Sequence, residues 1–347
     1  MYVSLLACKD ISDRAVICTI KLLKRYYFLN NMTVYLIELH KKKPIATGEA
    51  TSVLKQIDSN VKITNEEDFI LAETNVVLPD LTKKLAFTQA IYEYICDFDN
   101  ESIKNVNWKK YYKDNFAVRS VDKNVVDKLA KSIWDGVDDP KVKLDNSDME
   151  VSMFFNKVFV LRQTILKELF NRENQKRPMK SSMTLSPSIA MAMVNLTKGE
   201  TVYDPFCGMG GMLLEAAVLG RKTIGSDLSY SMVKATEINM KHFGFKDVDV
   251  FRADAMKHVL EKKADAIVCD VPYGHASGLF GHTREDLYVG FLNNLPNLLK
   301  KGGDLVFIMP SKVDYKGIIK SCGYEIYEEY SEYMHATLTR HIIHIVL

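Results

Sequence analysis

The stretch Thr201-Val-Tyr-Asp-Pro-Phe-Cys-Gly-Met-Gly-Gly-Met-Leu-Leu-Glu215 decides the fold of this chain. A β-branched and aromatic run at 201–203 predicts a strand, and an apolar helical pattern begins near Gly210, directly after a glycine-rich turn. A strand, a glycine turn and a helix in immediate succession form the nucleotide-binding unit of α/β proteins, because bare backbone lets a ligand approach closely. Asp204 stands where the strand ends. We therefore expect a ligand at this turn.

The sequence from Ser186 to the C-terminus predicts a doubly wound sheet around this unit. Strands alternate with helices, and a late pair of strands closes the chain without a helix between them. This pattern predicts a Rossmann-like α/β sheet of seven strands whose last strand is antiparallel. The expected strands are 201–203, 222–226, 248–253, 266–269, 304–309, 324–333 and 339–347.

The N-terminal half predicts two smaller α/β domains. The first has expected strands at 2–7 and 33–39 and expected helices at 10–29 and 50–57. Asp122 is expected to cap a helix in the second domain. The elements expected in the second domain are strands at 69–71, 74–77 and 115–121, helices at 81–94 and 122–134, and a hairpin of 149–155 with 157–162. We expect domains at 1–68 and 69–162, a basic linker at 163–182 and a C-terminal domain at 183–347.

Composition excludes several classes of protein. The chain has 347 residues, 47% of them hydrophobic and 26% charged, which is ordinary for a globular protein of two or three domains. No apolar run approaches the roughly 18 residues that span a membrane, so we expect no membrane association. Six scattered cysteines without a C-x-x-C pair predict no zinc site and no disulfide framework, which favours a cytoplasmic protein. The net charge of +2 decides nothing about nucleic acid.

The glycine turn does not match the dinucleotide fingerprint, because Leu213 stands where the last glycine would be required. Asp227 ends the next expected strand, where a carboxylate can accept both ribose hydroxyls. Asp254 ends the third expected strand, where it can accept a hydrogen bond from an adenine amino group. An acidic rim suits a cationic ligand, and Asp204 can hold an ammonium group. S-adenosylmethionine meets all these demands. The expected cofactor-binding residues are Asp204, Phe206, Gly208, Gly210, Asp227, Asp254 and Ala255.

The fourth strand ends in Asp270-Val-Pro-Tyr-Gly274, close to the (Asp/Asn/Ser)-Pro-Pro-(Tyr/Phe) pattern of amino-methyltransferases, with Val271 in place of the first proline. An exocyclic amine is a poor nucleophile because its lone pair is conjugated into the ring. Asp270 and the Pro272 carbonyl can accept its two N–H bonds and aim the lone pair at a methyl donor. Tyr273 can stack on the base. These three residues are the expected catalytic residues, and no cysteine nucleophile is expected.

Together these motifs resemble a class I S-adenosylmethionine-dependent methyltransferase acting on an amino nitrogen. Arg177-Pro-Met-Lys-Ser-Ser-Met-Thr-Leu-Ser-Pro187 and Met334-His-Ala-Thr-Leu-Thr-Arg340 are similar to the archaeal tRNA guanine-N2 methyltransferases that modify guanosine 10. Asn115-Phe-Ala-Val-Arg-Ser-Val121 and 142–151 resemble a THUMP domain, an RNA-binding module. A ferredoxin-like domain before it would account for 1–68.

The resemblance implies methyl transfer to the N2 amino group of a tRNA guanosine, at position 10, with one or two methyl groups added. The THUMP-like domain would hold the tRNA by its shape and phosphates. Nothing in the sequence requires a metal or a helper subunit. The expected RNA contacts are Lys109, Lys110, Lys113, Arg119, Arg172, Lys176 and Arg177.

Several alternatives remain open at this point. Within the class, the target can be another tRNA guanosine such as position 6, a ribosomal RNA guanosine, or an adenine N6. Outside the class, an NAD-dependent enzyme is opposed by Leu213, and a non-catalytic RNA-binding protein is opposed by Asp270 and Tyr273.

Overall fold

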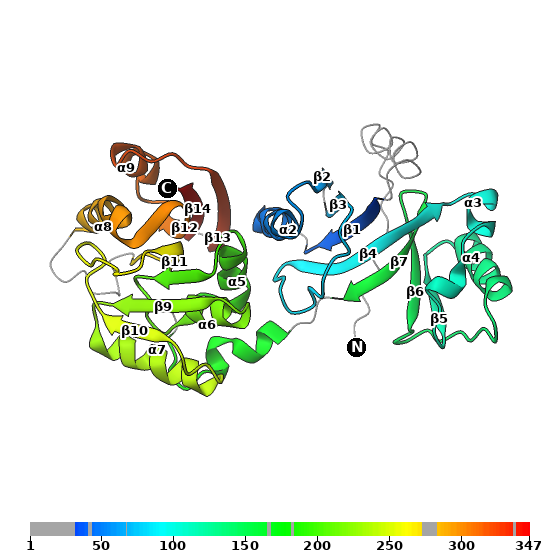
Figure 1. Ribbon diagram of the computed structural model, residues 1–347, viewed down its shortest axis with the longest axis horizontal. Coiled ribbons are helices and arrows are strands. Elements are labelled where there is room, and N and C mark those ends of the chain that lie inside the picture. The colour runs from blue at the N-terminus through cyan, green and yellow to red at the C-terminus, as the bar shows by residue number, and fades with distance from the viewer. Residues whose placement is uncertain are drawn as a thin grey trace. The chain divides into compact units, whose positions relative to one another are not determined.

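The computed structural model describes residues 32–40, 44–66, 68–164, 168–181, 184–272, 283–335 and 338–347. These residues form two compact units (Figure 1). The first takes 32–39, 57–81 and 88–164, and the second takes the rest. The strand expected at 2–7 and the helix expected at 10–29 lie outside the described residues.

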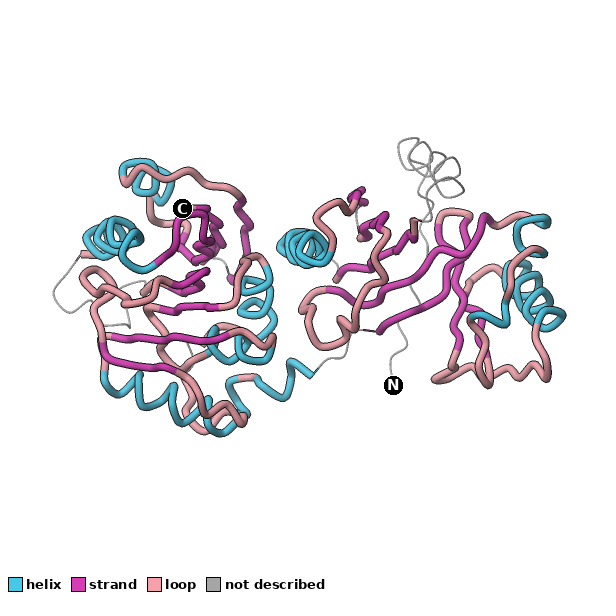
Figure 2. The backbone as a smooth tube through the Cα atoms, in the orientation of Figure 1, coloured by secondary structure: helices cyan, strands magenta, loops and turns pink. Residues whose placement is uncertain are grey.

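The first unit is built on one seven-stranded sheet of order β2-β3-β1-β4-β7-β6-β5. Its strands are drawn in magenta in Figure 2. Its pairs are antiparallel except for β5 with β6. Strands from both of the predicted N-terminal domains therefore share one sheet, and the division at residue 68 stays a prediction. The strands are β1 (Thr33–Leu39), β2 (Lys62–Glu66), β3 (Phe69–Thr74), β4 (Thr88–Asp97), β5 (Phe116–Arg119), β6 (Met149–Phe154) and β7 (Lys157–Thr164).

Helices cover one part of this sheet. They are α3 (Asn100–Lys104), the 3-10 turn η1 (Trp108–Lys110) and α4 (Lys123–Gly136). The Asp122 carboxylate accepts from the Asn124 backbone N–H over 2.8 Å, so the predicted cap of α4 is confirmed. Apolar side chains of α4 pack with the strands in a core that includes Trp108, Phe116, Leu129, Ile133 and Val151.

The predicted helix at 81–94 is wrong, because residues 88–97 form strand β4. This strand lies between β1 and β7, and residues of both parities, such as Ile91 and Tyr92, are buried. A strand covered on both faces has a nearly continuous apolar run, which periodicity alone does not distinguish from a buried helix. The two short strands expected at 69–71 and 74–77 are instead the single strand β3.

The second unit contains the predicted seven-stranded Rossmann-like sheet, in the order β10-β9-β8-β11-β12-β14-β13. Strands β10, β9, β8, β11 and β12 are parallel, and β14 pairs antiparallel with both β12 and β13. The strands are β8 (Thr201–Asp204), β9 (Lys222–Asp227), β10 (Asp249–Arg252), β11 (Ala264–Asp270), β12 (Leu299–Pro310), β13 (Glu328–His335) and β14 (Leu338–Val346).

Helices connect these strands and bury both faces of the sheet. Side chains of α8 such as Phe291 and Leu295 pack on Ile267, Cys269 and Phe307 in one apolar core. The neighbouring strand residues of opposite parity, including Val268 and Val306, are also fully buried. The helices are α5 (Pro187–Asn195), α6 (Gly211–Val218), α7 (Tyr230–His242), α8 (Arg284–Leu298) and α9 (Tyr315–Ser321).

Two N-terminal segments, 40–56 and 82–87, belong to the second unit. The first contains most of helix α2 (Pro44–Ile57), which begins six residues before the predicted start at 50. Buried Glu49 of α2 accepts from the backbone N–H groups of Ala86 and Phe87, at 2.7 and 2.9 Å, and from the Asn195 side chain at 2.7 Å. Burial raises the pKa of Glu49 to about 7. This buried acid binds both segments to α5.

The basic connector forms two 3-10 turns, η2 (Glu168–Arg172) and η3 (Asn174–Lys176). Over the residues that the structure describes, no helix is long and apolar enough to cross a membrane.

Candidate active site

The glycine turn after β8 has the backbone that the sequence predicts. Gly208 and Gly210 have positive φ angles of 50° and 81°, which glycine adopts without steric cost, and Gly210 is the N-cap of α6. A Cβ atom at Gly208 would meet only the Phe206 carbonyl oxygen, at 3.9 Å, so the turn leaves open space beside it. This is the close approach that a cradled ligand requires.

Three predicted acids meet at the carboxyl edge of the parallel strands. Asp204 is 2% exposed, and its Oδ1 accepts from the Phe206 backbone N–H over 3.0 Å. Burial raises the pKa of Asp204 well above its ordinary value, and the charges of Asp227 and Asp270 add to this rise. Burial also raises the pKa of Asp227. A cation placed among these carboxyl groups would relieve their mutual repulsion.

Asp254 and Ala255 follow β10 at the same edge. The Ala253 N–H donates to the Asp227 carbonyl over 3.2 Å, which places the end of β10 beside the end of β9. Asp254 Oδ1 accepts from the Met256 N–H at 3.0 Å, and Ala255 is buried with its carbonyl bonded to Asn294. Predicted Phe206 packs edge-on against Phe291, with ring centroids 5.2 Å apart.

Two polar side chains of α7, which sequence reasoning missed, hold the glycine turn. Thr236 donates to the Gly208 carbonyl over 2.7 Å. The Asn239 amide donates to the Met209 carbonyl at 2.9 Å and to the Met179 carbonyl at 3.0 Å. Both side chains are fully buried. Polar residues three apart on a helix face are the signal that was available, because they share one side of the helix.

Two of the three predicted catalytic residues, Asp270 and Pro272, lie at and just after the end of β11. Asp270 is its last residue, and the Pro272 carbonyl two positions later accepts from the Tyr288 hydroxyl of α8 over 3.2 Å. Burial and the Asp270 charge both raise the pKa of Tyr288, which is about 12, so this hydroxyl is a donor at neutral pH. Sequence reasoning did not single out this contact of Tyr288 with the Pro272 carbonyl. Tyr273 lies outside the described residues.

Two segments singled out in the sequence meet in one pocket of the second unit, with a volume of about 330 Å³. Thr184, Leu185 and Ser186 come from the lead-in to α5, and Arg340 comes from the C-terminal hairpin. Arg340 pairs with Pro310 at the end of β12, so the pocket opens at the carboxyl edge of the sheet.

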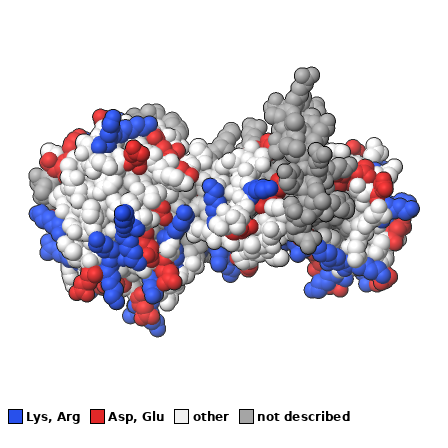
Figure 3. Space-filling view, turned by 45° about the horizontal axis from the view of Figure 1, so that its top comes forward, with Lys and Arg blue, Asp and Glu red and all other residues white. Residues whose placement is uncertain are grey.

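Three of the candidate RNA contacts are exposed lysines of the first unit, Lys109, Lys110 and Lys113. Two of them face acidic neighbours: Lys109 lies 2.7 Å from Asp138, and Lys110 lies 3.7 Å from Glu93. On the face drawn in Figure 3, Lys and Arg side chains are interspersed with Asp and Glu rather than gathered in one continuous patch.

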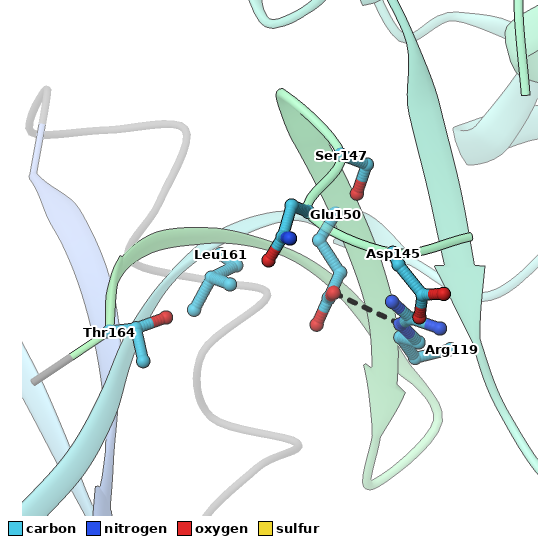
Figure 4. A pocket seen from close by; sticks show the side chains of 7 residues that line it. Arg119, Asp145, Ser147, Glu150, Leu161 and Thr164 are labelled. Carbon is cyan, nitrogen blue, oxygen red and sulfur yellow. Dashed lines mark hydrogen bonds and ion pairs between the residues drawn. The ribbon is translucent and has the colours of Figure 1, made fainter. Parts of the chain in front are cut away.

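Arg119, a fourth candidate, lines a pocket of about 640 Å³ in the first unit (Figure 4). Its Nε lies 3.0 Å from Glu150, and its guanidinium also donates to the Leu144 carbonyl. Asp145 lines the same pocket. The two acids outweigh the single arginine, so the pocket itself is a poor phosphate site.

Two of the predicted RNA contacts in the basic connector are buried, so their prediction is wrong. Arg172 is 9% exposed and Arg177 only 1%, so RNA does not reach their guanidinium groups. Arg172 instead makes a buried bidentate ion pair with Glu215 of α6. Lys176, between them in the sequence, is exposed and remains a candidate.

The described residues contain no group of three or more His, Cys, Asp or Glu side chains that could hold a metal ion. The residues at the glycine turn and at the carboxyl edge of the sheet fit S-adenosylmethionine. The open space at Gly208 admits its bulk, and the acids Asp204, Asp227 and Asp270 favour its positive charge.

A seven-stranded sheet of this order, with a glycine turn after β8 and acids at successive strand ends, defines an S-adenosylmethionine-dependent methyltransferase. The family described as "UPF0020: RMKL-like, methyltransferase domain" matches residues 174–341. The chain belongs to the tRNA (guanine(10)-N2)-dimethyltransferase family: it is 32% identical to the member from Methanothermobacter thermautotrophicus, over 89% of this chain and 97% of that protein.

Two further similar proteins are a second curated relative and a solved structure. The tRNA (guanine(10)-N2)-dimethyltransferase of Pyrococcus abyssi is 30% identical over 86% of this chain and 94% of its own length. The crystal structure of TrmN from Thermus thermophilus, at 16% identity, covers 90% of this chain and 100% of that chain with a TM-score of 0.49.

Proposed function

We propose that this protein transfers methyl groups from S-adenosylmethionine to the exocyclic N2 of guanosine 10 in tRNA, adding one and then a second. The observation that carries the proposal is the similarity of nearly the whole chain to a tRNA (guanine(10)-N2)-dimethyltransferase, at 32% identity. The proposal draws support from the acid and carbonyl at the end of β11.

Asp270 and the Pro272 carbonyl are the proposed acceptors for the two N–H bonds of the guanine amine. S-adenosylmethionine supplies an electrophilic methyl group on a positively charged sulfur. By accepting N–H bonds, Asp270 stabilises the positive charge that develops on the attacking nitrogen. Tyr288 fixes the direction of the Pro272 carbonyl through its 3.2 Å hydrogen bond. A carbonyl oxygen has two lone pairs, so it can accept from both groups.

The target base must leave its stack to reach these residues. We propose that the pocket between the lead-in to α5 and the C-terminal hairpin receives part of the flipped nucleotide, because it opens at the same edge as Asp270. We propose that the first unit binds the tRNA as a THUMP-like module, with Lys109, Lys110, Lys113 and Arg119 as candidate contacts. Lys176 of the second unit is a further candidate.

The position of the target is tested with tRNA transcripts in which single guanosines are replaced by adenosine. Methyl incorporation from labelled cofactor should disappear when guanosine 10 is replaced and persist when guanosine 6 is replaced. Loss in the second transcript and not in the first would assign the enzyme to the acceptor stem. Persistence in both would move the target elsewhere.

A further inference from the structure

A buried arginine beside the glycine turn has hydrogen-bonding capacity that the protein does not use. Arg177 is 1% exposed, and its Nε donates to the Arg172 carbonyl over 2.9 Å. Its Nη1 and Nη2 atoms are buried and have no hydrogen-bond partner among the described residues. A buried cation without partners is costly, so a ligand that satisfies these donors would be strongly favoured.

The charges around Arg177 leave one positive charge without a counterion. Arg172 and Glu215 neutralise each other in a bidentate pair, with contacts of 2.8 to 3.2 Å. Arg177 lies close enough to both for their charges to affect its pKa, which burial lowers. The cluster of two guanidinium groups and one carboxylate therefore lacks one anion.

The free end of Arg177 faces the N-terminus of α6. A Cβ atom built on Gly211, the first residue of that helix, would lie 3.2 Å from Nη1 of Arg177 and 3.6 Å from the Thr184 methyl. A helix N-terminus presents unpaired N–H groups and a partial positive charge, so it favours an anion. The guanidinium and the helix terminus together make a site for one carboxylate, and Thr184 lies beside it.

We propose that Arg177 binds the α-carboxylate of the methionine part of S-adenosylmethionine, together with the N-terminus of α6 and Thr184. The inference rests on the proposed function for the identity of the ligand. The site adjoins the turn of Gly208 to Gly210, where we place the cofactor, and the cofactor carries one carboxylate. An RNA phosphate is the other anion available, but the burial of Arg177 keeps a polynucleotide backbone away.

The test compares the binding of S-adenosylmethionine and decarboxylated S-adenosylmethionine to the full chain by calorimetry. The wild-type protein should prefer the carboxylate form by about ten- to a hundredfold, the range of a charge-assisted hydrogen-bonded pair. In Arg177→Gln this preference should fall to within about threefold, while affinity for the decarboxylated form stays unchanged. Arg177→Lys, which keeps the charge, should retain part of the preference.

Arg221→Gln is the control, because Arg221 is a half-buried arginine of the same unit that lies beyond the C-terminal end of α6. It donates to the carbonyls of Val194, Thr197 and Lys198. The substitution should lower stability and keep the preference. If circular dichroism shows Arg177→Gln unfolded, Arg177→Lys carries the comparison.

A preference unchanged in the Arg177 variant, or an equal loss of affinity for both ligands, would overturn the proposal, since the second marks a purely structural role. A wild-type protein that binds neither ligand would overturn the proposed function as well. A loss of tRNA affinity with the preference intact would assign the anion to RNA.

Discussion

The backbone N–H of Gly208 donates a 3.1 Å hydrogen bond to Oδ2 of Asp227. This contact ties the glycine turn after β8 to the acid at the end of β9. The other carboxylate oxygen of Asp227 accepts from the Ser229 N–H at 2.8 Å. One side chain therefore fixes the two loops between which the cofactor is proposed to lie.

Asp227→Ala should weaken S-adenosylmethionine binding by about ten- to a hundredfold, because it removes both a ribose acceptor and a tie on the glycine turn. Isothermal titration of the full chain measures this. Asp247→Ala, in the exposed loop before β10, is the matched control and should bind normally. Unchanged affinity in the Asp227 variant would remove the ribose assignment.

Thr236→Val should lower the free energy of unfolding by about 1–3 kcal/mol, because it leaves the Gly208 carbonyl without its donor. Thr51→Val is a close comparison. Thr51 is also on a helix of the second unit, but its buried hydroxyl has no partner among the described residues, so its loss should change stability by less than about 0.5 kcal/mol. Urea denaturation measures both variants. Equal effects would show that the hydrogen bond to the turn does not matter.

The interactions of His344 in β14 should make the stability of the fold depend on pH. Its Nε2 lies 2.8 Å from Asp304 of β12. Burial lowers the pKa of His344, but the hydrogen bond to Asp304 and the Glu328 carboxylate 3.9 Å away outweigh this and raise it above its ordinary 6.5. The folded state thus holds the proton more tightly. The stabilisation is complete below pH 6.5 and is lost as the pH rises through the folded-state pKa.

His344→Gln should therefore flatten the decline of the melting temperature from pH 6 upward. His242→Gln, an exposed residue of α7, should leave that decline unchanged. Melting curves across the pH range compare the three proteins. An undiminished decline in the His344 variant would mean that another group is responsible.

Replacing Lys109, Lys110 and Lys113 together by glutamine should weaken tRNA binding by about tenfold and reduce its salt dependence, without changing cofactor affinity. The effect is limited because Asp138 and Glu93 already offset two of the charges. Replacing three lysines of α4, the exposed Lys123 and Lys131 and the half-buried Lys128, removes the same charge from the same unit. Filter binding at several salt concentrations separates the two sets. An equal loss would indicate only a general charge effect.

Much of the second unit could be predicted from the sequence because its signals are local. Asp204, Asp227 and Asp270 each end a strand, and parallel strands place their carboxyl ends at one edge. The support from Thr236, Asn239 and Tyr288 was not predictable in this way. These residues act on backbone atoms 16 to 60 positions away, which no local pattern reveals.

Arg172 and Arg177 were predicted to contact RNA, but both are buried. In a basic run, arginines are expected to face solvent. Here Glu215, an acid on the buried face of α6, holds Arg172 in the interior, and Arg177 follows it. The burial of a charge depends on a partner distant in the sequence, so composition assigned both residues to RNA.

Nucleoside mass spectrometry of unmodified tRNA, incubated with the protein and S-adenosylmethionine, tests the central claim most directly. The wild-type protein should produce N2-methylguanosine and then N2,N2-dimethylguanosine. Asp270→Ala should produce neither while binding the cofactor within about threefold of wild type. Methylation at another atom, or undiminished turnover in the Asp270 variant, would contradict the account.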